Sequence, residues 1–371
     1  MRKDLERVEI PNEHEARVRT WQVVEAAFAS RHPTEPRRSW RPLVVALAAL
    51  AAVAAVLSPP GRAVLGEVRE VVGVEKADPA LFSLPADGRV LVSADTGIWI
   101  VQQDGSRRRL GDYASASWSP FGRFVVATRA NELAALEPDG EVRWKLSRPQ
   151  IRFARWSGTR RDTRIAYLSG QTLRVVAGDS TPDVLIARNV AAVAPAWRPG
   201  ARHVLAFVAT DGRVHLVDVD RRRTLLRSQR TIVGPVALEW SRDGSTLLAL
   251  GTRSVEPVVG GGEPVRLEGP GVALAAAPRG RTFAVVERLA GGRSRVSTLG
   301  ADARELFAGK GRFSSLEWSP DGAWLLVAWR DADQWVFVRA RGAPRLRAAS
   351  AAAGQFESTS FPRVEGWCCA P

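Results

Sequence analysis

Histidine, cysteine and carboxylate side chains are the groups with which this chain would do acid–base, nucleophilic or metal chemistry. The 371 residues include four histidines, which are His14, His32, His203 and His215. A hydrolytic triad needs a nucleophile, a base and an orienting group within reach of one another. No Gly-x-Ser-x-Gly turn and no hydrolase domain accompany these histidines. We therefore predict no catalytic residue and no enzyme activity.

Metal and cofactor motifs are equally sparse. His203 and His215 fall on adjacent strands of one predicted repeat, but two ligands do not make a metal site. The chain has no phosphate-binding loop, no G-x-G-x-x-G turn and no calcium loop. The only cysteines, Cys368 and Cys369, are adjacent; a disulfide between them is one interpretation, and two small residues in a closing strand is the interpretation we favour. We predict neither a metal nor a cofactor.

The charge of the chain is strongly basic. Lysine and arginine number 53 against 39 acidic residues, which gives a net charge of +14, and nearly all the basic residues are arginine. A composition rich in Arg, Ala, Gly and Val is typical of a high-GC bacterial genome. Basic surfaces bind nucleic acid, anionic lipid or anionic polymers. Because only residues 107–109 and 221–223 form short basic runs, we do not expect nucleic-acid binding.

A repeat with a period near 40 residues organises the chain from residue 81 onward. Each unit has a tryptophan that ends a strand, then a turn with Pro, Asp or Gly, then an apolar strand. The repeated tryptophans, which we interpret as structural, are Trp118, Trp156, Trp197, Trp240 and Trp318, with a further Trp367 at the end. This period is typical of the four-stranded blades of a β-propeller, in which large flat side chains fill the space between neighbouring blades.

The turn at residues 318–322, WSPDG, resembles the mark of the TolB-like or WD40-like (PD40) propeller family. The resemblance covers residues 81–371 and implies the fold. It implies an interaction platform as the general role, since the family shares no single activity. Residues 156–158, which lack the Pro and Asp, indicate a diverged blade.

Seven repeat starts predict an all-β fold with seven blades, with six or eight blades as the alternatives. The first unit lacks its own tryptophan strand, and residues 363–369 have the pattern of that missing strand. The two ends of the chain are therefore expected to share one blade and close the ring, and deleting the last ten residues is expected to destabilise the fold.

Residues 43–57 are wholly apolar and lie between Arg41-Pro42 and Ser58-Pro59-Pro60. We predict a transmembrane helix at residues 43–58, with a secretory signal peptide and a buried core helix as the alternatives. Four arginines between positions 31 and 41 precede this segment, and the residues after it have mixed charge. The positive-inside rule then predicts a cytoplasmic N-terminus and a propeller outside the cytoplasm.

A short helix is expected before the span, with Asn12 as its N-cap. Its apolar face consists of Val18, Trp21, Val24 and Phe28. This face either docks a cytoplasmic partner or lies on the inner leaflet of the membrane. The predicted organisation is thus a cytoplasmic segment at 1–42, a span at 43–58, a juxtamembrane helix and linker at 59–80, and the propeller at 81–371.

These features favour a non-enzymatic, single-pass membrane protein of the cell membrane. Its propeller is expected to bind a protein, peptide or envelope ligand outside the cytoplasm, and its N-terminal helix to signal to a cytoplasmic regulator, as in the layout of membrane-anchored anti-sigma factors. The alternative is a TolB-like structural scaffold of the cell envelope, in which the N-terminal segment only anchors the propeller.

Overall fold

The structure is a computed structural model that describes residues 74–75, 83–157, 159, 162–300 and 303–369. The chain divides into two compact units, Met1–Ala63 and Val64–Pro371, and every described residue belongs to the second. The predicted cytoplasmic helix, the span at 43–58 and most of the 59–80 segment lie outside the described residues. Within the described part, no helix has the length and apolar character needed to cross a membrane.

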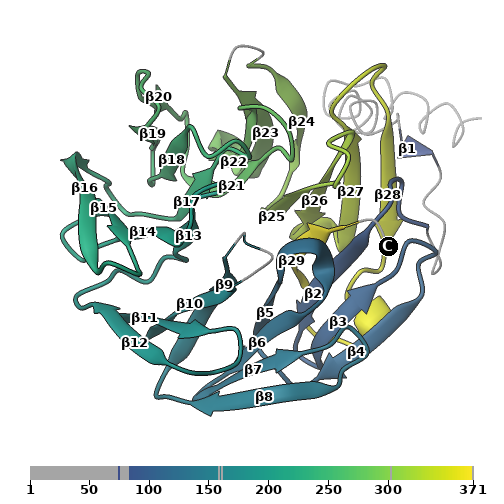
Figure 1. The fold of residues 1–371 in the computed structure, drawn as a ribbon. Helices are drawn as coiled ribbons and strands as arrows, with labels where there is room; N and C mark the ends of the chain where they lie inside the picture. The colour runs from purple at the N-terminus through teal and green to yellow at the C-terminus, as the bar shows by residue number, and fades with distance from the viewer. Residues whose placement is uncertain (1–73, 76–82, 158, 160–161, 301–302, 370–371) are drawn as a thin grey trace, which may run out of the picture. The chain divides into compact units, whose positions relative to one another are not determined.

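Seven antiparallel sheets of four principal strands surround a central axis, as Figure 1 shows. The prediction of an all-β, seven-bladed propeller is confirmed. The innermost strands are β29 (Arg363–Cys368), β5 (Ser115–Trp118), β9 (Ile151–Trp156), β13 (Ala196–Trp197), β17 (Ala237–Trp240), β21 (Gly271–Ala276) and β25 (Phe313–Trp318). They belong to blades 1 to 7 in that order, and each contacts the next around the ring, including β25 with β29 and β29 with β5.

The remaining strands continue each blade outward. The second strands are β2 (Arg89–Ala94), β6 (Val125–Arg129), β10 (Arg164–Ser169), β14 (Val204–Val208), β18 (Leu247–Leu250), β22 (Phe283–Leu289) and β26 (Trp324–Trp329). The third strands are β3 (Gly97–Val101), β7 (Glu132–Leu136), β11 (Thr172–Ala177), β15 (Arg213–Asp218), β19 (Ser254–Val259), β23 (Arg293–Leu299) and β27 (Gln334–Arg339). The fourth strands are β4 (Arg107–Gly111), β8 (Val142–Ser147), β12 (Asp183–Ala187), β16 (Arg223–Thr231), β20 (Val265–Arg266), β24 (Glu305–Lys310) and β28 (Leu346–Ser350). Short 3₁₀ turns occur at η1 (Pro120–Gly122), η2 (Ala290–Gly292), η3 (Arg330–Ala332) and η4 (Gly354–Phe356).

The C-terminal strand closes the ring. Strand β29 is the innermost strand of blade 1 and pairs antiparallel with β2, with Trp367 opposite Val90 and Arg363 opposite Ser93. The expectation that residues 363–369 supply the missing strand of the first blade is therefore confirmed. Because β2 lies near the start of the propeller and β29 at its end, backbone hydrogen bonds between distant parts of the chain hold the circle shut.

Blade 7 carries one additional strand, β1 (Val74–Glu75). It pairs in parallel with the outer strand β28, with Val74 opposite Leu346 and Glu75 opposite Arg347. The segment that precedes the propeller in sequence thus adds its backbone to the outer edge of the seventh blade.

The hydrophobic core lies in the spaces between blades. All six residues of β26 are buried, whereas outer strands such as β8 and β16 alternate between exposed and half-buried residues. Two-sided burial of the middle strands explains their continuous apolar runs, because each blade packs against a neighbour on both faces. One cluster of buried side chains fills each of the seven gaps.

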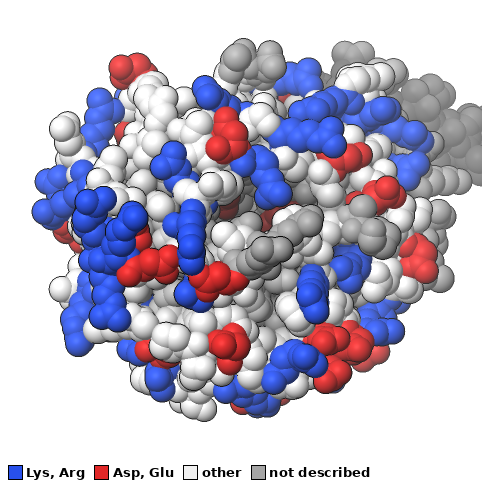
Figure 2. All heavy atoms as spheres, in the orientation of Figure 1, with Lys and Arg blue, Asp and Glu red and all other residues white. Residues whose placement is uncertain are grey.

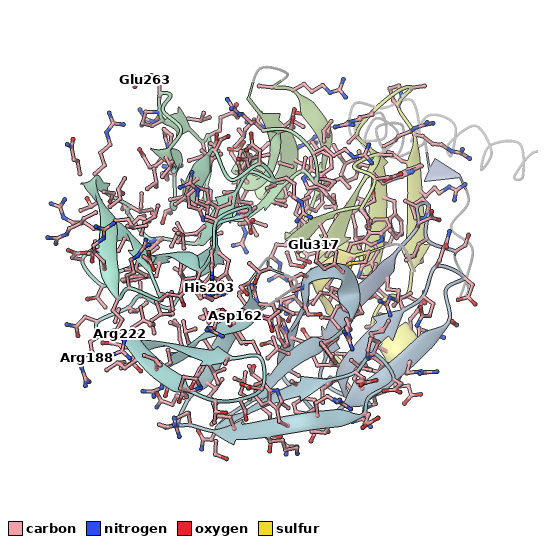
Figure 3. All side chains as sticks on the ribbon, in the orientation of Figure 1. Asp162, Arg188, His203, Arg222, Glu263 and Glu317 are labelled. Carbon is pink, nitrogen blue, oxygen red and sulfur yellow. A yellow bond between two sulfur atoms is a disulfide. The ribbon has the colours of Figure 1, made fainter. Side chains whose placement is uncertain are left out.

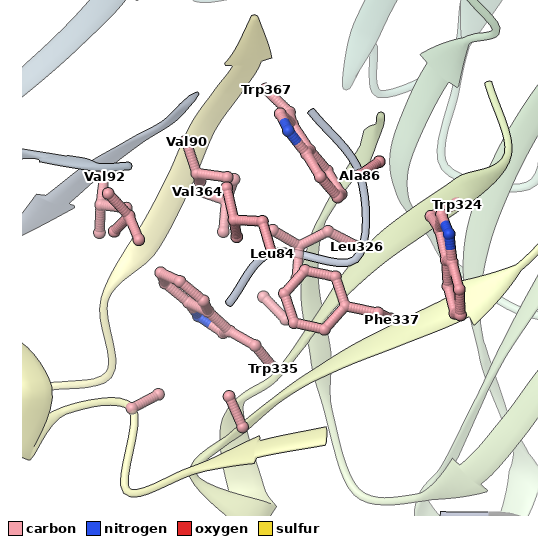
Figure 4. Close-up of a cluster of buried hydrophobic side chains, with 14 of the residues drawn as sticks. Leu84, Ala86, Val90, Val92, Trp324, Leu326, Trp335, Phe337, Val364 and Trp367 are labelled. Carbon is pink, nitrogen blue, oxygen red and sulfur yellow. The ribbon is translucent and has the colours of Figure 1, made fainter. Parts of the chain in front are cut away.

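The gap between blades 7 and 1 is rich in aromatic side chains, as Figure 4 shows. Trp335, Phe337 and Trp367 lie there with aliphatic residues of β2 such as Val90. The rings of Phe337 and Trp367 meet edge to face, with centroids 5.7 Å apart. The same end of β29 carries a disulfide between Cys368 and Cys369, with sulfur atoms 2.05 Å apart. The favoured interpretation of these cysteines as two unlinked small residues was therefore wrong, while their place in the closing strand is as expected.

Candidate binding site in the central channel

The structure places the repeated tryptophans on the innermost strands. Trp118, Trp156, Trp197, Trp240 and Trp318 each end such a strand, and Trp367 is the penultimate residue of β29. Trp118 and Trp197 are half-buried and the other four are buried.

Three of these indoles also join neighbouring blades by hydrogen bonds. Trp197 Nε1 donates to the carbonyl of Arg155 at 2.9 Å, and Trp240 Nε1 donates to the carbonyl of Ala196 at 3.3 Å. Trp318 donates in the same way at 3.2 Å to the strand of blade 6. In each case the acceptor lies on the innermost strand of the preceding blade. A side chain that is both packed and hydrogen-bonded within the ring has little surface left for a ligand.

The turns that follow the tryptophans form a second set of contacts between blades. The glycines of these turns have positive φ, which is +66° at Gly244 and +71° at Gly322. A Cβ at Gly244 would lie 2.2 Å from the carbonyl oxygen of Pro199, and one at Gly322 would lie 3.2 Å from Pro278. The glycine of the WSPDG-type turn is therefore needed both for its backbone conformation and for the close approach of the previous blade.

The residue before each tryptophan points away from the blade gap, because side chains alternate along a strand. Four of these residues, Arg155, Ala196, Glu239 and Glu317, line a channel of about 1350 Å³ that all seven innermost strands border. Its lining includes three carboxylates, Glu239 from β17, Glu317 from β25 and Glu365 from β29, and four arginines, Arg152, Arg155, Arg242 and Arg363. Figure 3 shows Glu317 beside the centre of the ring.

Burial dominates the electrostatics of two of these carboxylates. Removal from bulk water raises the pKa of Glu239 to about 7, and the Arg155 guanidinium lowers it by less. Burial raises the pKa of Glu317 to about 8, and the negative charges of Glu239 and Glu365 add to the effect while Arg155 opposes it. Both residues are half-buried, because they face the channel from inside the ring of blades. Desolvation therefore outweighs the attraction of a single guanidinium.

Glu365 differs from its two neighbours because it already has partners. Its Oε1 accepts hydrogen bonds from Ser93 at 2.8 Å and from Arg363 Nε at 2.9 Å. Glu239 and Glu317, by contrast, form no hydrogen bond or ion pair within the described residues. Two carboxylates with raised pKa values and no partner, facing one cavity, can bind a cation and can take up and release protons near neutral pH. The described lining of the channel includes no histidine, cysteine or lysine.

The two histidines of the propeller lie in blade 4, as predicted, but in separate surroundings. His203 is buried, with Nδ1 2.7 Å from Asp220 Oδ2 and Nε2 2.7 Å from the carbonyl oxygen of Asp162 in blade 3. Figure 3 shows His203 and Asp162 near each other. His215 stacks on Phe207 with ring centroids 5.2 Å apart, and burial lowers its pKa. Both rings therefore have structural contacts.

One group of carboxylates has the spacing of metal ligands. Glu137, Asp139 and Glu141 lie within 4.8 Å of one another on the turn between β7 and β8. Arg143 pairs with Glu137 at 3.4 Å and with Glu141 at 3.5 Å. This exposed turn already has a counter-charge, and no second observation indicates an ion there.

Sequence reasoning missed the channel residues. The available signal was a charged residue directly before a packed tryptophan in three repeats, at Arg155, Glu239 and Glu317. The other predicted site, formed by Val18, Trp21, Val24 and Phe28, lies outside the described residues.

The fold and the channel define the chain as a seven-bladed β-propeller with a charged central cavity. No family model and no curated protein sequence matches the chain. Among solved structures it is similar to a functionally unknown protein from Desulfotomaculum acetoxidans, with a TM-score of 0.55 and 10% identity over 71% of this chain and 99% of that one. It is also similar to the Cps50 (Swd1) β-propeller domain of Myceliophteria thermophila, with a TM-score of 0.50 and 15% identity over 64% of this chain and 86% of that one.

A third similar structure is the Kuenenia stuttgartiensis hydrazine synthase, with a TM-score of 0.50 and 13% identity over 61% of this chain and 76% of that one. At these identities the likeness concerns the fold alone. A propeller is a scaffold consistent with protein binding.

Proposed function

We propose that the protein is a non-enzymatic binding propeller whose central channel takes a positively charged segment of a protein or peptide. The observation that carries this proposal is the pair Glu239 and Glu317, which face one cavity and have no partner within the described residues. Of the four arginines in the lining, Arg155 is the one that lowers the pKa of both carboxylates, and both pKa values stay raised, so an arginine or lysine side chain of a ligand would supply the missing counter-charge.

The size of the channel supports a peptide over a small metabolite. Small-molecule sites usually enclose about 300–1,000 Å³, and this channel encloses about 1350 Å³. Its lining includes small residues from several innermost strands, such as Ala194, Ala237 and Ser315. A cavity of this kind fits an extended segment better than it fits one compact molecule.

The finer parts of the proposal come from the sequence. Residues 43–57 anchor the chain in a membrane as a single span, with the propeller outside the cytoplasm and residues 1–42 inside. The turn at residues 318–322 supports a relationship to TolB-like or PD40 propellers. The contact with a cytoplasmic regulator is then formed by Val18, Trp21, Val24 and Phe28. Binding of a ligand outside the cytoplasm is thereby signalled to the regulator inside.

Charge-neutral substitutions in the channel test the binding function. The full chain is titrated with fluorescent peptides of alanine and glycine that carry one central arginine, with norleucine in place of arginine as the probe control. Losing a charge-assisted contact weakens binding by about tenfold or more, so Glu239→Gln with Glu317→Gln should raise Kd by that factor. The matched control is Glu263→Gln, because Glu263 is exposed on the β19–β20 hairpin at the rim (Figure 3). Equal affinity of the double variant and the parent would exclude the channel as the binding site.

The pH dependence provides an independent measurement. With pKa values of about 7 for Glu239 and about 8 for Glu317, both carboxylates are largely protonated at pH 6 and largely ionised at pH 9. A cation binds the ionised form, so affinity for the arginine peptide should rise from pH 6 to pH 9. The double glutamine variant should lose this dependence.

The anchoring is tested separately by protease accessibility in spheroplasts, with one tag before Asn12 and another after Pro371. Loss of the C-terminal tag alone supports a propeller outside the cytoplasm. Protection of both tags contradicts it. Replacing Trp21 and Phe28 by alanine, with membrane insertion unchanged, should give a phenotype and abolish retention of a cytoplasmic regulator. A variant without a phenotype would support a plain anchor and the scaffold alternative.

A further inference from the structure

The pairing of β1 with β28 fixes where the N-terminal part of the chain meets the propeller. Because the pairing is parallel and Val74 lies opposite Leu346, β1 begins at the end of the blade where β28 begins. The hairpin between β27 and β28, residues 340–345, ends at that same point. The hairpin therefore lies beside the place where the chain arrives from the apolar segment.

This hairpin region is basic and exposed. Arg339, Arg341 and Arg345 are all exposed, and Arg304 of the neighbouring blade donates to the carbonyl of Ala340 at 2.7 Å. Within the described residues, Arg339 and Arg341 form no ion pair with a carboxylate; Arg339 lies over the ring of Trp324 at 6.0 Å. Figure 2 shows basic side chains gathered on the rim where Figure 1 places β27 and β28.

A small cleft adjoins these arginines. It encloses about 310 Å³ between β24 and the β27–β28 hairpin, and Arg339 and Arg345 border it together with one acidic residue, Glu305. Its apolar lining consists of Leu306, Phe307, Ala308, Val338, Pro344 and Leu346. An apolar cleft with two guanidinium groups at its edge suits a phosphate group attached to an apolar body.

A short stretch of chain connects the apolar segment to β1. Sixteen residues, 58–73, separate residue 57 from Val74. Even fully extended they reach only about 60 Å. Of the two basic runs in the sequence, residues 107–109 lie on β4 of the neighbouring blade 1, and residues 221–223 lie on blade 4, where Asp218 pairs with Arg221 at 3.1 Å.

We propose that Arg339, Arg341 and Arg345 bind the phosphate headgroups of anionic phospholipids, so that blade 7 rests on the membrane that holds residues 43–57. This inference rests on the proposed anchoring and names a partner for the propeller surface beside it. It would orient the ring with the β27–β28 edge toward the lipid and leave the opposite rim free.

Hydrogen exchange of the full chain in nanodiscs tests the contact. Discs are made of phosphatidylcholine alone or with phosphatidylglycerol, and exchange is followed for the amides of residues 340–346. A basic side chain near an anionic surface contributes about a fivefold preference, so exchange should slow by at least that factor in the anionic discs. Arg339→Gln with Arg341→Gln should restore the rate seen in phosphatidylcholine. The matched control, Arg188→Gln with Arg222→Gln, changes two exposed arginines elsewhere (Figure 3) and should change nothing.

The outcomes separate the two proposals. A chain that does not incorporate into discs and is removed from membranes by alkaline carbonate contradicts the anchoring itself. A chain that incorporates but shows equal exchange in both discs overturns the lipid contact and leaves the anchoring intact. Equal slowing of amide exchange by inorganic phosphate in phosphatidylcholine discs also overturns the lipid contact, because the arginines would then bind a soluble anion.

Discussion

Two gaps between blades show how differently one fold fills the same kind of space. The gap between blades 7 and 1 contains five buried aromatic residues, Trp324, Trp335, Phe337, Phe356 and Trp367. The gap between blades 5 and 6 contains one, Phe283, among aliphatic residues. Blades 5 and 6 follow each other along the chain, whereas blade 1 is completed by strands from both ends of the propeller. The large aromatic surface lies where association of distant segments has the greatest entropic cost.

Blades 5 and 6 pack without the repeated tryptophan because the large aromatic side chain comes from a different strand of blade 6. Trp318 lies opposite Leu325 in blade 7, while at the same register in blade 6 Ala276 lies opposite Phe283. The large ring has moved from the innermost strand to the second strand, and Phe283 is 2% exposed. Each pair therefore contributes one large aromatic ring, from the innermost strand in blade 7 and from the second strand in blade 6.

Removing the closing strand should have the largest effect. A chain that ends at Pro362 lacks β29 and with it Val364 and Trp367 of the closing gap. We expect loss of cooperative unfolding, because the innermost edge of blade 1 and one wall of the channel are lost together. Thermal unfolding followed by near-UV circular dichroism measures this. Trp367→Phe, which keeps the strand, is the control and should still unfold cooperatively; a truncated chain with an unchanged Tm would contradict the closure.

Single truncations in the two gaps should sharpen the contrast. Trp335 is 1% exposed in the closing gap and Leu274 is 6% exposed between blades 5 and 6. Trp335→Ala should lower the free energy of unfolding by about 3–5 kcal/mol and Leu274→Ala by about 2–3 kcal/mol. Denaturant unfolding gives both values. If Leu274→Ala lowered the free energy of unfolding as much as Trp335→Ala, the aromatic residues of the closing gap would stabilise the ring no more than the aliphatic residues between blades 5 and 6.

Restoring the repeated tryptophan in blade 6 tests whether Phe283 on the second strand takes the place of a tryptophan on the innermost strand. Ala276→Trp alone should destabilise by about 1–3 kcal/mol, because Phe283 already fills the space. Ala276→Trp with Phe283→Leu recreates the pair of blade 7 and should recover most of that loss. A double-mutant cycle by urea unfolding measures the coupling. Additive costs would show that the two residues do not share one space.

The smallest effect concerns the hydrogen bonds of the indoles. Trp197 Nε1 donates to the carbonyl of Arg155, whereas Trp156 Nε1 has no partner within the described residues. Trp197→Phe should therefore cost about 1 kcal/mol more than Trp156→Phe. Chemical denaturation of the two variants side by side measures the difference, and equal costs would mean that packing alone accounts for the tryptophans.

Much of the ring could be predicted from the residues. The spacing of Trp118, Trp156, Trp197 and Trp240 gave the blade length, and the tryptophan at position 367 gave the closure. The channel could not be predicted in the same way. Glu239 and Glu317 are 78 residues apart and belong to different blades, so nothing local places their carboxylates in one cavity or indicates their raised pKa values.

The sequence by itself determined the local pattern of this protein: the period of the blades, the apolar middle strands and the glycine turns. These follow from side-chain alternation and backbone conformation, which act within a few residues. Only the tertiary structure decided which charges share the channel, that Phe283 lies opposite Ala276, and that β1 joins the edge of blade 7 at Leu346 and Arg347. These depend on the closure of the ring, which brings distant segments to distances that no local pattern specifies.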